Sequence, residues 1–250
     1  NWQLDIADVE ATIQKNTRYI TLNDPHNPSG ALLDYDTKLA LIGLAEKYDL
    51  LIFSDEVYRL LELNPSERSP SMAELSDRAI ALSTMSKPWG AGGTGIGWVV
   101  CQDSIIYSQL LQAQHIYAVC FSRAGEIQAM MALRCSTEII NKNLAIIARN
   151  LALLKQYFDL NSDLFDWIAP RAGGTGFVRF KGPITANQLA EQLLENEILV
   201  FPSSIFDCDE NLGQYFRIGF SRTTMPAALE AFKRYVQNQR SVWQTQIAES

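Results

Sequence analysis

The sequence predicts an α/β fold, with a mostly parallel β-sheet and flanking helices in a large domain and a smaller α+β domain after it. Three observations predict this. Short apolar runs end in polar turns at three places in the first half of the chain. A helical pattern or a long loop separates successive runs, as in strand–crossover–strand units. After a long helical pattern at 137–158, shorter strand and helix patterns follow. We expect domains at 1–145 and 146–250.

Composition narrows the classes of function. The 250 residues are 47% hydrophobic and 20% charged, which is typical of a globular protein with a substantial core. The formal net charge of −7 argues against nucleic acid or an anionic membrane as a partner. We find neither a signal peptide nor an apolar run long enough to span a bilayer.

The cysteines and histidines predict no metal site. Four cysteines are widely spaced without a C-x-x-C pair, and the two histidines cannot complete a convincing zinc set with them. We interpret the cysteines as free, buried thiols in a reducing compartment, which indicates a cytoplasmic protein.

The first polar turn follows an expected helix at 4–14 and an expected strand at 18–22. It reads Asn23-Asp-Pro-His-Asn27-Pro-Ser-Gly30, and its two prolines exclude helix for the residues before them. A plain turn is one interpretation. The other is that Asn27, fixed between prolines, offers its side-chain amide to a ligand at the end of the strand.

The second polar turn follows an amphipathic helix at 35–48 and an apolar strand at 50–53, which is typical of a sheet buried on both faces. Asp55 and Tyr58 come directly after this strand. Open α/β sheets bind ligands at the carboxyl ends of their strands. The alternative is a helix N-cap with an exposed acid.

The third turn contains Lys87, between apolar runs at 79–82 and 96–100 that we interpret as buried strands. A surface lysine in a turn is one possibility. In the other, Lys87 lies at a buried strand end where the hydroxyls of Thr84 and Ser86 and the loop amides hold a phosphate. A lysine withdrawn from water can form a Schiff base, so this arrangement suits pyridoxal phosphate.

The glycine-rich loop after Lys87 literally matches the dinucleotide-binding pattern G-x-G-x-x-G over Gly90–Gly95. That interpretation requires a helix directly after the glycines. The residues that follow instead predict a strand, so we reject it. The three strands therefore lead to Asn27, Asp55 and Lys87, and three such groups at neighbouring strand ends are much less probable by chance than one.

The rest of the chain predicts the second domain. Arg217 lies in an otherwise apolar strand at 214–220 and needs a partner, either a structural ion pair or a bound carboxylate. The other expected elements are helices at 104–111, 125–133, 186–195 and 226–239, and strands at 165–168, 177–180 and 198–201.

Four motifs in order resemble those of the class I/II (fold-type I) pyridoxal-phosphate-dependent aminotransferases. The turn at 23–30 is similar to that family's N-P-x-N-P-[ST]-G, and 54–58 to its D-E-x-Y strand end. Thr84-Met-Ser-Lys87 resembles its S-x-S-K lysine motif, and 216–220 its carboxylate-binding arginine strand.

The resemblance implies roles for these residues. Lys87 bonds the cofactor and moves the proton, and Asp55 pairs with the pyridine nitrogen. Tyr58 and Asn27 bond the ring's phenolic oxygen. Thr84 and Ser86 contact the phosphate, and Arg217, with Asn27, binds the substrate. It also implies amino acid and 2-oxo acid substrates and a homodimer.

Two departures from the family matter. Gly95 stands where the family usually has a phosphate-binding arginine. The family's N-terminal part has no counterpart here, so we expect a truncated form with one sheet edge open to pairing. The leading hypothesis is an aminotransferase. A pyridoxal-phosphate-dependent lyase or cyclase, and a non-catalytic relative of the same fold, are the alternatives.

Overall fold

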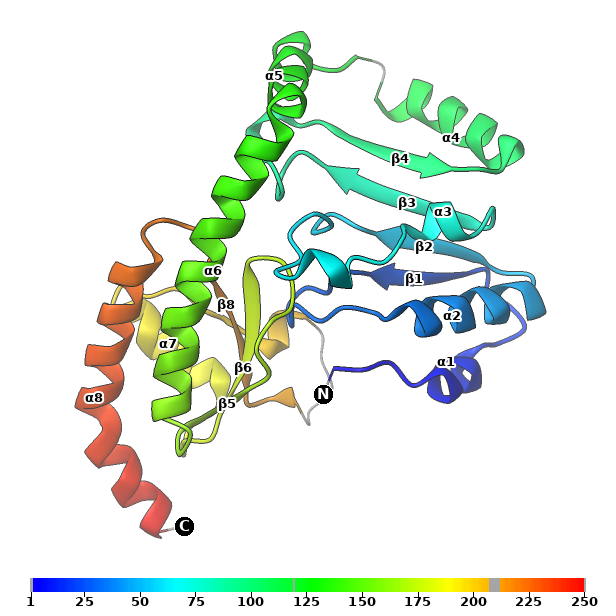
Figure 1. The fold of residues 1–250 in the computed structure, drawn as a ribbon. Coiled ribbons are helices and arrows are strands. Elements are labelled where there is room, and N and C mark those ends of the chain that lie inside the picture. Colours follow the sequence, from blue (N-terminus) through cyan, green and yellow to red (C-terminus); the bar gives the residue numbers. More distant parts are fainter. Residues whose placement is uncertain (1, 119, 207–211, 250) are drawn as a thin grey trace. The chain divides into compact units, whose positions relative to one another are not determined.

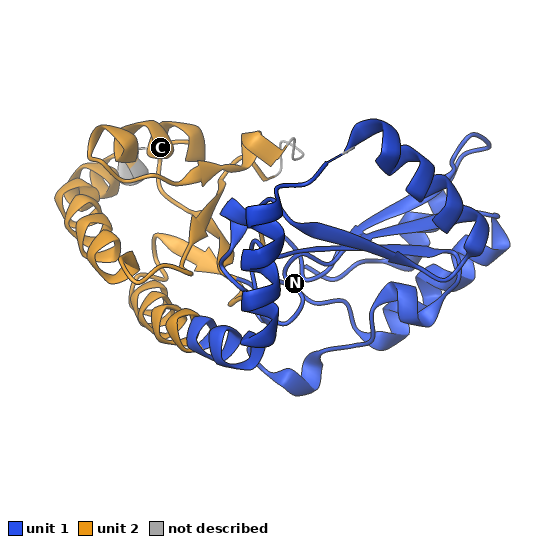
Figure 2. Ribbon diagram, turned by 90° about the horizontal axis from the view of Figure 1, so that it is seen from above, with its two compact units in different colours: residues 1–27, 31–144, 171–173 blue, residues 28–30, 145–170, 174–250 orange. Residues whose placement is uncertain are grey.

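The computed structural model describes residues 2–118, 120–206 and 212–249. Two compact units divide the chain (Figure 2). The first comprises 1–27, 31–144 and 171–173, and the second 28–30, 145–170 and 174–250. Helix α6 (Ser136–Leu160) contributes residues to both. Each unit is described by itself below.

The first unit contains a four-stranded sheet in the order β1-β2-β3-β4 (Figure 1). Its strands are β1 (Tyr19–Asn23), β2 (Leu51–Asp55), β3 (Ala79–Thr84) and β4 (Gly97–Cys101). The first three run parallel, and β4 is antiparallel to β3. The predicted mostly parallel sheet is therefore confirmed, and the carboxyl ends of β1, β2 and β3 meet at the same edge.

Helices and short turns connect these strands and continue the unit. They are α1 (Ile6–Thr12), α2 (Tyr35–Lys47), η1 (Pro65–Glu67), α3 (Met72–Leu75), η2 (Gly92–Thr94), α4 (Ser104–Tyr117) and α5 (Arg123–Arg134). Helix α2 begins where Asp34 accepts a hydrogen bond from the Thr37 N–H. Its apolar residues, among them Leu41 and Ala45, pack with Leu22 and Ile52 of the sheet to form the first core. This packing fixes the two strands that lead to Asn27 and Asp55.

The second unit has an antiparallel sheet in the order β5-β6-β8-β7. Its elements besides α6 are β5 (Phe165–Trp167), β6 (Thr175–Phe180), α7 (Ala186–Glu195), β7 (Phe201–Pro202), η3 (Ser203–Phe206), β8 (Tyr215–Gly219) and α8 (Met225–Glu249). Phe165, Phe180 and Phe216 are fully buried at its centre, where aromatic rings meet mainly edge-on or tilted. The predicted α+β character of this part is confirmed.

Three expectations about burial or length are wrong. The run at 96–100 forms β4, but most of this strand is exposed because β4 lies at the end of the described sheet and pairs only with β3 there. The strand at 50–53 is fully buried on one face and half-buried on the other. The strand expected at 198–201 is reduced to Phe201–Pro202, although Ile198 and Val200 are still buried.

The cysteines also differ from expectation. Cys101, Cys120 and Cys135 are free, but Cys120 and Cys135 are exposed and Cys101 is half-buried. Both exposed thiols lie next to α5, whose surface is largely accessible. Cys208 lies outside the described residues. Within 2–118, 120–206 and 212–249, no helix has the length and apolar character needed to cross a bilayer. The same residues contain no cluster of three His, Cys, Asp or Glu placed to hold a metal ion.

Candidate active site

Hydrogen bonds fasten the turn that carries Asn27 to the end of strand β2. In the sheet register, Asn23 lies opposite Asp55. The Asn23 side-chain amide and the Asp24 N–H both donate to the Asp55 carbonyl, each at 3.1 Å. The Asn27 N–H donates to Asn23 Oδ1 at 2.6 Å. Asn23 therefore links the backbones of two predicted site residues, which fixes the distance between the two strand ends.

The two acids at the end of β2 have different environments. Asp55 is half-buried, and its Oδ1 accepts a hydrogen bond from the Val57 N–H at 3.1 Å. Glu56 is buried and accepts hydrogen bonds from the Ser71 hydroxyl and the Met72 N–H, both at 2.9 Å. The Glu56 carboxylate thus binds the start of α3, whereas the Asp55 carboxylate accepts one hydrogen bond, from within its own turn.

Lys87 and Tyr58 lie together. The Lys87 Nζ is 5.4 Å from the centroid of the Tyr58 ring, and Tyr58 is buried. The Lys87 side chain itself is exposed, which agrees with the interpretation of a lysine in a turn and not with the alternative of a lysine at a buried strand end. The reason is that β3 ends at Thr84, three residues before Lys87, and the lysine extends from the turn beyond it.

The residues on either side of Lys87 anchor its turn. Met85 is fully buried, and its N–H donates to the Ile96 carbonyl at 3.0 Å. Trp89 is buried and donates its indole N–H to the Ser136 hydroxyl at 2.7 Å. The Asn143 side chain donates to the Pro88 carbonyl at 2.8 Å. The exposed Lys87 side chain thus extends from a backbone turn that buried Met85 and Trp89 anchor.

The predicted phosphate contacts lie just before Lys87. Thr84 and Ser86 are both half-buried, and the Ser86 N–H donates to Thr84 Oγ1 at 3.2 Å. The glycine loop forms a single 3₁₀ turn, Gly92–Thr94, and then leads into strand β4 rather than an α-helix. The absence of a helix directly after these glycines agrees with the rejection of the dinucleotide pattern. Gly95 has a positive φ of 65° and open space where a side chain would start.

Sequence reasoning missed Gly173, which packs against Tyr58. Its φ is +75°, and a Cβ built on it would lie 3.1 Å from Tyr58 Cδ1. The neighbouring Ala172 forms a β-bridge with Glu62, and the Gly173 N–H donates to the Leu61 carbonyl at 3.0 Å. The signal was the Ala-Gly-Gly sequence at 172–174, which predicts a tight turn but not the ring that it contacts.

Sequence reasoning also missed a buried ion pair between Lys38 and Asp24. Their Nζ and Oδ2 atoms are 2.7 Å apart, with side chains only 3% and 5% exposed. The signal lay in the motif, because the family pattern quoted above has asparagine where this chain has Asp24. A carboxylate there needs a cation when it is buried.

Arg217 lies in the second unit, at the centre of strand β8. It faces Phe177 of β6 and Phe201 of β7 in the register. Its guanidinium carbon is 4.7 Å from the Phe201 ring centroid and 5.2 Å from that of Phe206. These rings hold the half-buried guanidinium. The first unit contains the other predicted residues, Asn27, Asp55, Tyr58, Thr84, Ser86 and Lys87.

Comparison with known proteins decides the family. Residues 1–232 match the family described as Aminotransferase class I and II. The chain belongs to this family. The aminotransferase-family resemblance inferred from four motifs is therefore confirmed.

Individual relatives agree with the family assignment. The chain is 28% identical over 219 residues to a capreomycidine synthase of Streptomyces vinaceus, and 27% identical over 231 residues to a probable aspartate aminotransferase of Methanocaldococcus jannaschii. These alignments cover 87% and 88% of this chain, but 54% and 58% of the relatives. A crystal structure of a PLP-dependent aminotransferase from Streptococcus suis is 28% identical, with a TM-score of 0.85 over 95% of this chain and 62% of that one. The chain thus spans little more than half the length of the curated relatives it matches.

Proposed function

We propose that this protein is a pyridoxal-phosphate-dependent aminotransferase that moves an amino group between an amino acid and a 2-oxo acid. The observation that carries the proposal is the position of Lys87. Its amine is accessible, lies over the Tyr58 ring, and extends from an anchored turn after the strand that neighbours β2 and Asp55.

The side chains of the first unit fit the chemical groups of pyridoxal phosphate. A free amine matches the aldehyde, and a carboxylate with one local hydrogen bond matches the pyridine nitrogen. The phenol of Tyr58 and the amide of Asn27 match the phenolic oxygen, and the hydroxyls of Thr84 and Ser86 match the phosphate. The Streptococcus suis structure similar to this chain is described as PLP-dependent.

Each residue then has a defined task. When bound, pyridoxal phosphate supplies an electron-withdrawing ring that stabilises negative charge at the substrate Cα. Lys87 Nζ would hold the cofactor at its aldehyde carbon, and as a free amine it would move the proton at the substrate Cα. The Asp55 carboxylate holds a proton on the pyridine nitrogen. Arg217 binds the substrate α-carboxylate through its planar guanidinium.

A lyase or cyclase that uses the same residues is the second candidate. The similarity to a protein named as a synthase rather than a transaminase favours keeping it. Lys87, Asp55 and Tyr58 would have the same tasks in it up to removal of the Cα proton. The two reactions would differ in the fate of the amino group, which only transamination passes to a 2-oxo acid. A homodimer and a cytoplasmic location remain predictions from the resemblance and the composition.

The test is to mix purified protein and pyridoxal phosphate with single amino acids, without a 2-oxo acid. Transamination predicts one equivalent of pyridoxamine phosphate and one of 2-oxo acid per site, measured by chromatography. Continued product formation with pyridoxal phosphate regenerated would favour the lyase or cyclase. No product and no spectral change with any amino acid would favour a non-catalytic relative.

A further inference from the structure

We propose that Lys38 is a positioning residue that holds the Asn27 turn in place by neutralising Asp24. This inference rests on the proposed function, since it concerns the turn that carries a predicted cofactor-binding residue. Lys38 lies near the start of helix α2, which follows the Asn27 turn in the sequence. A buried lysine at this place requires a charged partner, because lysine is almost never fully buried unless it is paired.

The contacts of Asp24 show which parts of the chain the ion pair with Lys38 connects. Its Oδ2 pairs with Lys38 Nζ at 2.7 Å, and its Oδ1 accepts a hydrogen bond from the Leu33 N–H at 3.0 Å. Its own N–H donates to the Asp55 carbonyl at 3.1 Å. Asp24 therefore connects the start of the turn to strand β2 through Asp55, and to the residues after the turn through Leu33. Lys38 connects this arrangement to helix α2.

Lys38 makes a second contact that extends the connection. Its Nζ donates to the Pro70 carbonyl at 3.2 Å, directly before the capping residue Ser71 of α3. The hydroxyl of Ser71 in turn donates to Glu56, the residue that follows Asp55. Two loops that flank the end of β2 thus meet at the same buried ammonium group.

Single and double replacements of the ion pair distinguish a positioning role of Lys38 from a contact without function. Removing one partner of a buried ion pair leaves a buried charge without compensation, whereas replacing both by uncharged groups is often neutral. If Lys38 holds the turn, the single variants should loosen 24–33 and the double variant should not. Lys47 of the same helix pairs with Glu10 of helix α1 and offers a matched comparison because its side chain is 61% exposed.

The experiment is hydrogen–deuterium exchange of the purified protein without cofactor, followed peptide by peptide. We expect Lys38→Met and Asp24→Asn to speed exchange in 24–33 at least tenfold, with strand β8 in the second unit unchanged. The double variant should return to within about threefold of wild type, and Lys47→Met should match wild type. A second readout is the dissociation constant for pyridoxal phosphate, which should rise in the singles and recover in the double.

Several results would overturn the proposal. Wild-type exchange in 24–33 of folded Lys38→Met would do so, as would a loss of protection spread evenly over the first unit. If Lys38→Met does not fold, the double variant decides, because it must fold and protect the turn. Absence of cofactor binding by wild type, with the exchange pattern as expected, would instead refute the proposed function and leave the role of Lys38 in holding the turn supported.

Discussion

The Nζ atom of Lys87 lies over the ring of Tyr58, 5.4 Å from the ring centroid. Tyr58 is buried and Lys87 is exposed, so a fixed aromatic surface carries an accessible amine. A cation over an aromatic ring contributes about 0.5–1 kcal/mol at an accessible site. This contact orients the amine without withdrawing it from solvent, which agrees with the role proposed for Lys87.

Tyr58 variants separate the ring from the hydroxyl. Tyr58→Phe keeps the ring and removes one predicted hydrogen bond to the cofactor, so the dissociation constant for pyridoxal phosphate should rise about fivefold, the equivalent of roughly 1 kcal/mol. Tyr58→Leu removes both and should raise it further. Absorbance titration measures both constants. Tyr48→Phe, which loses an exposed bond to Glu10, is the control. Wild-type affinity in Tyr58→Leu would exclude Tyr58 from the site.

Gly173 should not tolerate a side chain. Its φ of +75°, together with the 3.1 Å separation between Tyr58 Cδ1 and the position that a Cβ would occupy, predicts strain in Gly173→Ala. A left-handed residue other than glycine costs about 1–3 kcal/mol, so the free energy of unfolding should fall by that amount in urea titrations. Gly43→Ala is the matched control. Gly43 lies inside helix α2 with no atom within 4 Å of an added Cβ, so that variant should be about 0.5–1 kcal/mol more stable.

Asn143 should hold the turn that carries Lys87. Asn143→Ala removes the donor to the Pro88 carbonyl and should lower the free energy of unfolding by about 1 kcal/mol. Amides of 86–91 should then exchange faster with deuterium. Asn141→Ala changes an exposed residue of the same helix and should alter neither quantity. Equal exchange rates in the two variants would contradict the anchoring role.

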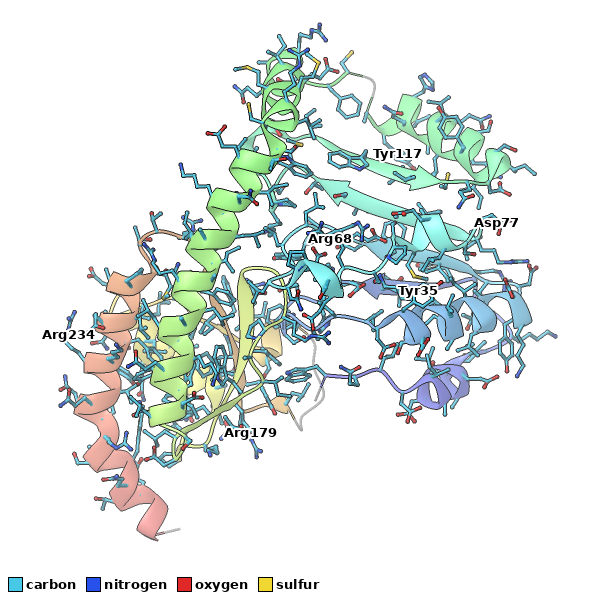
Figure 3. The ribbon with its side chains drawn as sticks, viewed as in Figure 1. Tyr35, Arg68, Asp77, Tyr117, Arg179 and Arg234 are labelled. Carbon is cyan, nitrogen blue, oxygen red and sulfur yellow. The ribbon has the colours of Figure 1, made fainter. Side chains whose placement is uncertain are left out.

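Arg217 should determine affinity for the substrate carboxylate. Arg217→Lys keeps the charge but loses the planar pair of donors, so KM for the amino acid should rise roughly tenfold or more. Arg179→Lys is the control, because Arg179 lies exposed on the neighbouring strand β6 (labelled in Figure 3). If the two variants raised KM equally, an ordinary structural role for Arg217 would be the better account.

The strands of the first unit, and the positions of Asn27, Asp55 and Lys87 at or beyond their ends, followed from the sequence because local patterns determine them. Apolar runs at 50–53 and 79–82 bounded by polar turns were enough to predict two neighbouring parallel strands and the residues at their ends. The burial of β4 was predicted wrongly because the same pattern fits a central strand and an edge strand. Burial depends on what packs against the strand, and that information is not local.

Contacts between residues distant in sequence could not be predicted. Gly173 and Tyr58 are 115 positions apart, and only the folded chain brings them together. The helical pattern at 35–48 contains Lys38 but does not single it out, and its burial follows from the place of Asp24 beyond strand β1. For Lys87 the sequence left an exposed turn lysine and a buried one both open, and the side chain is exposed while Met85 and Trp89 on either side of it are buried.

The most direct test of the central claim is the visible absorbance spectrum of the purified protein with pyridoxal phosphate, compared with Lys87→Ala. We expect a band of the lysine-bound cofactor in the wild type that is absent in Lys87→Ala and retained in the control Lys47→Met, whose lysine is exposed. After borohydride reduction, mass spectrometry should find the cofactor on the peptide that contains Lys87. A band of equal strength in Lys87→Ala, or the cofactor reduced onto another lysine, would contradict the account.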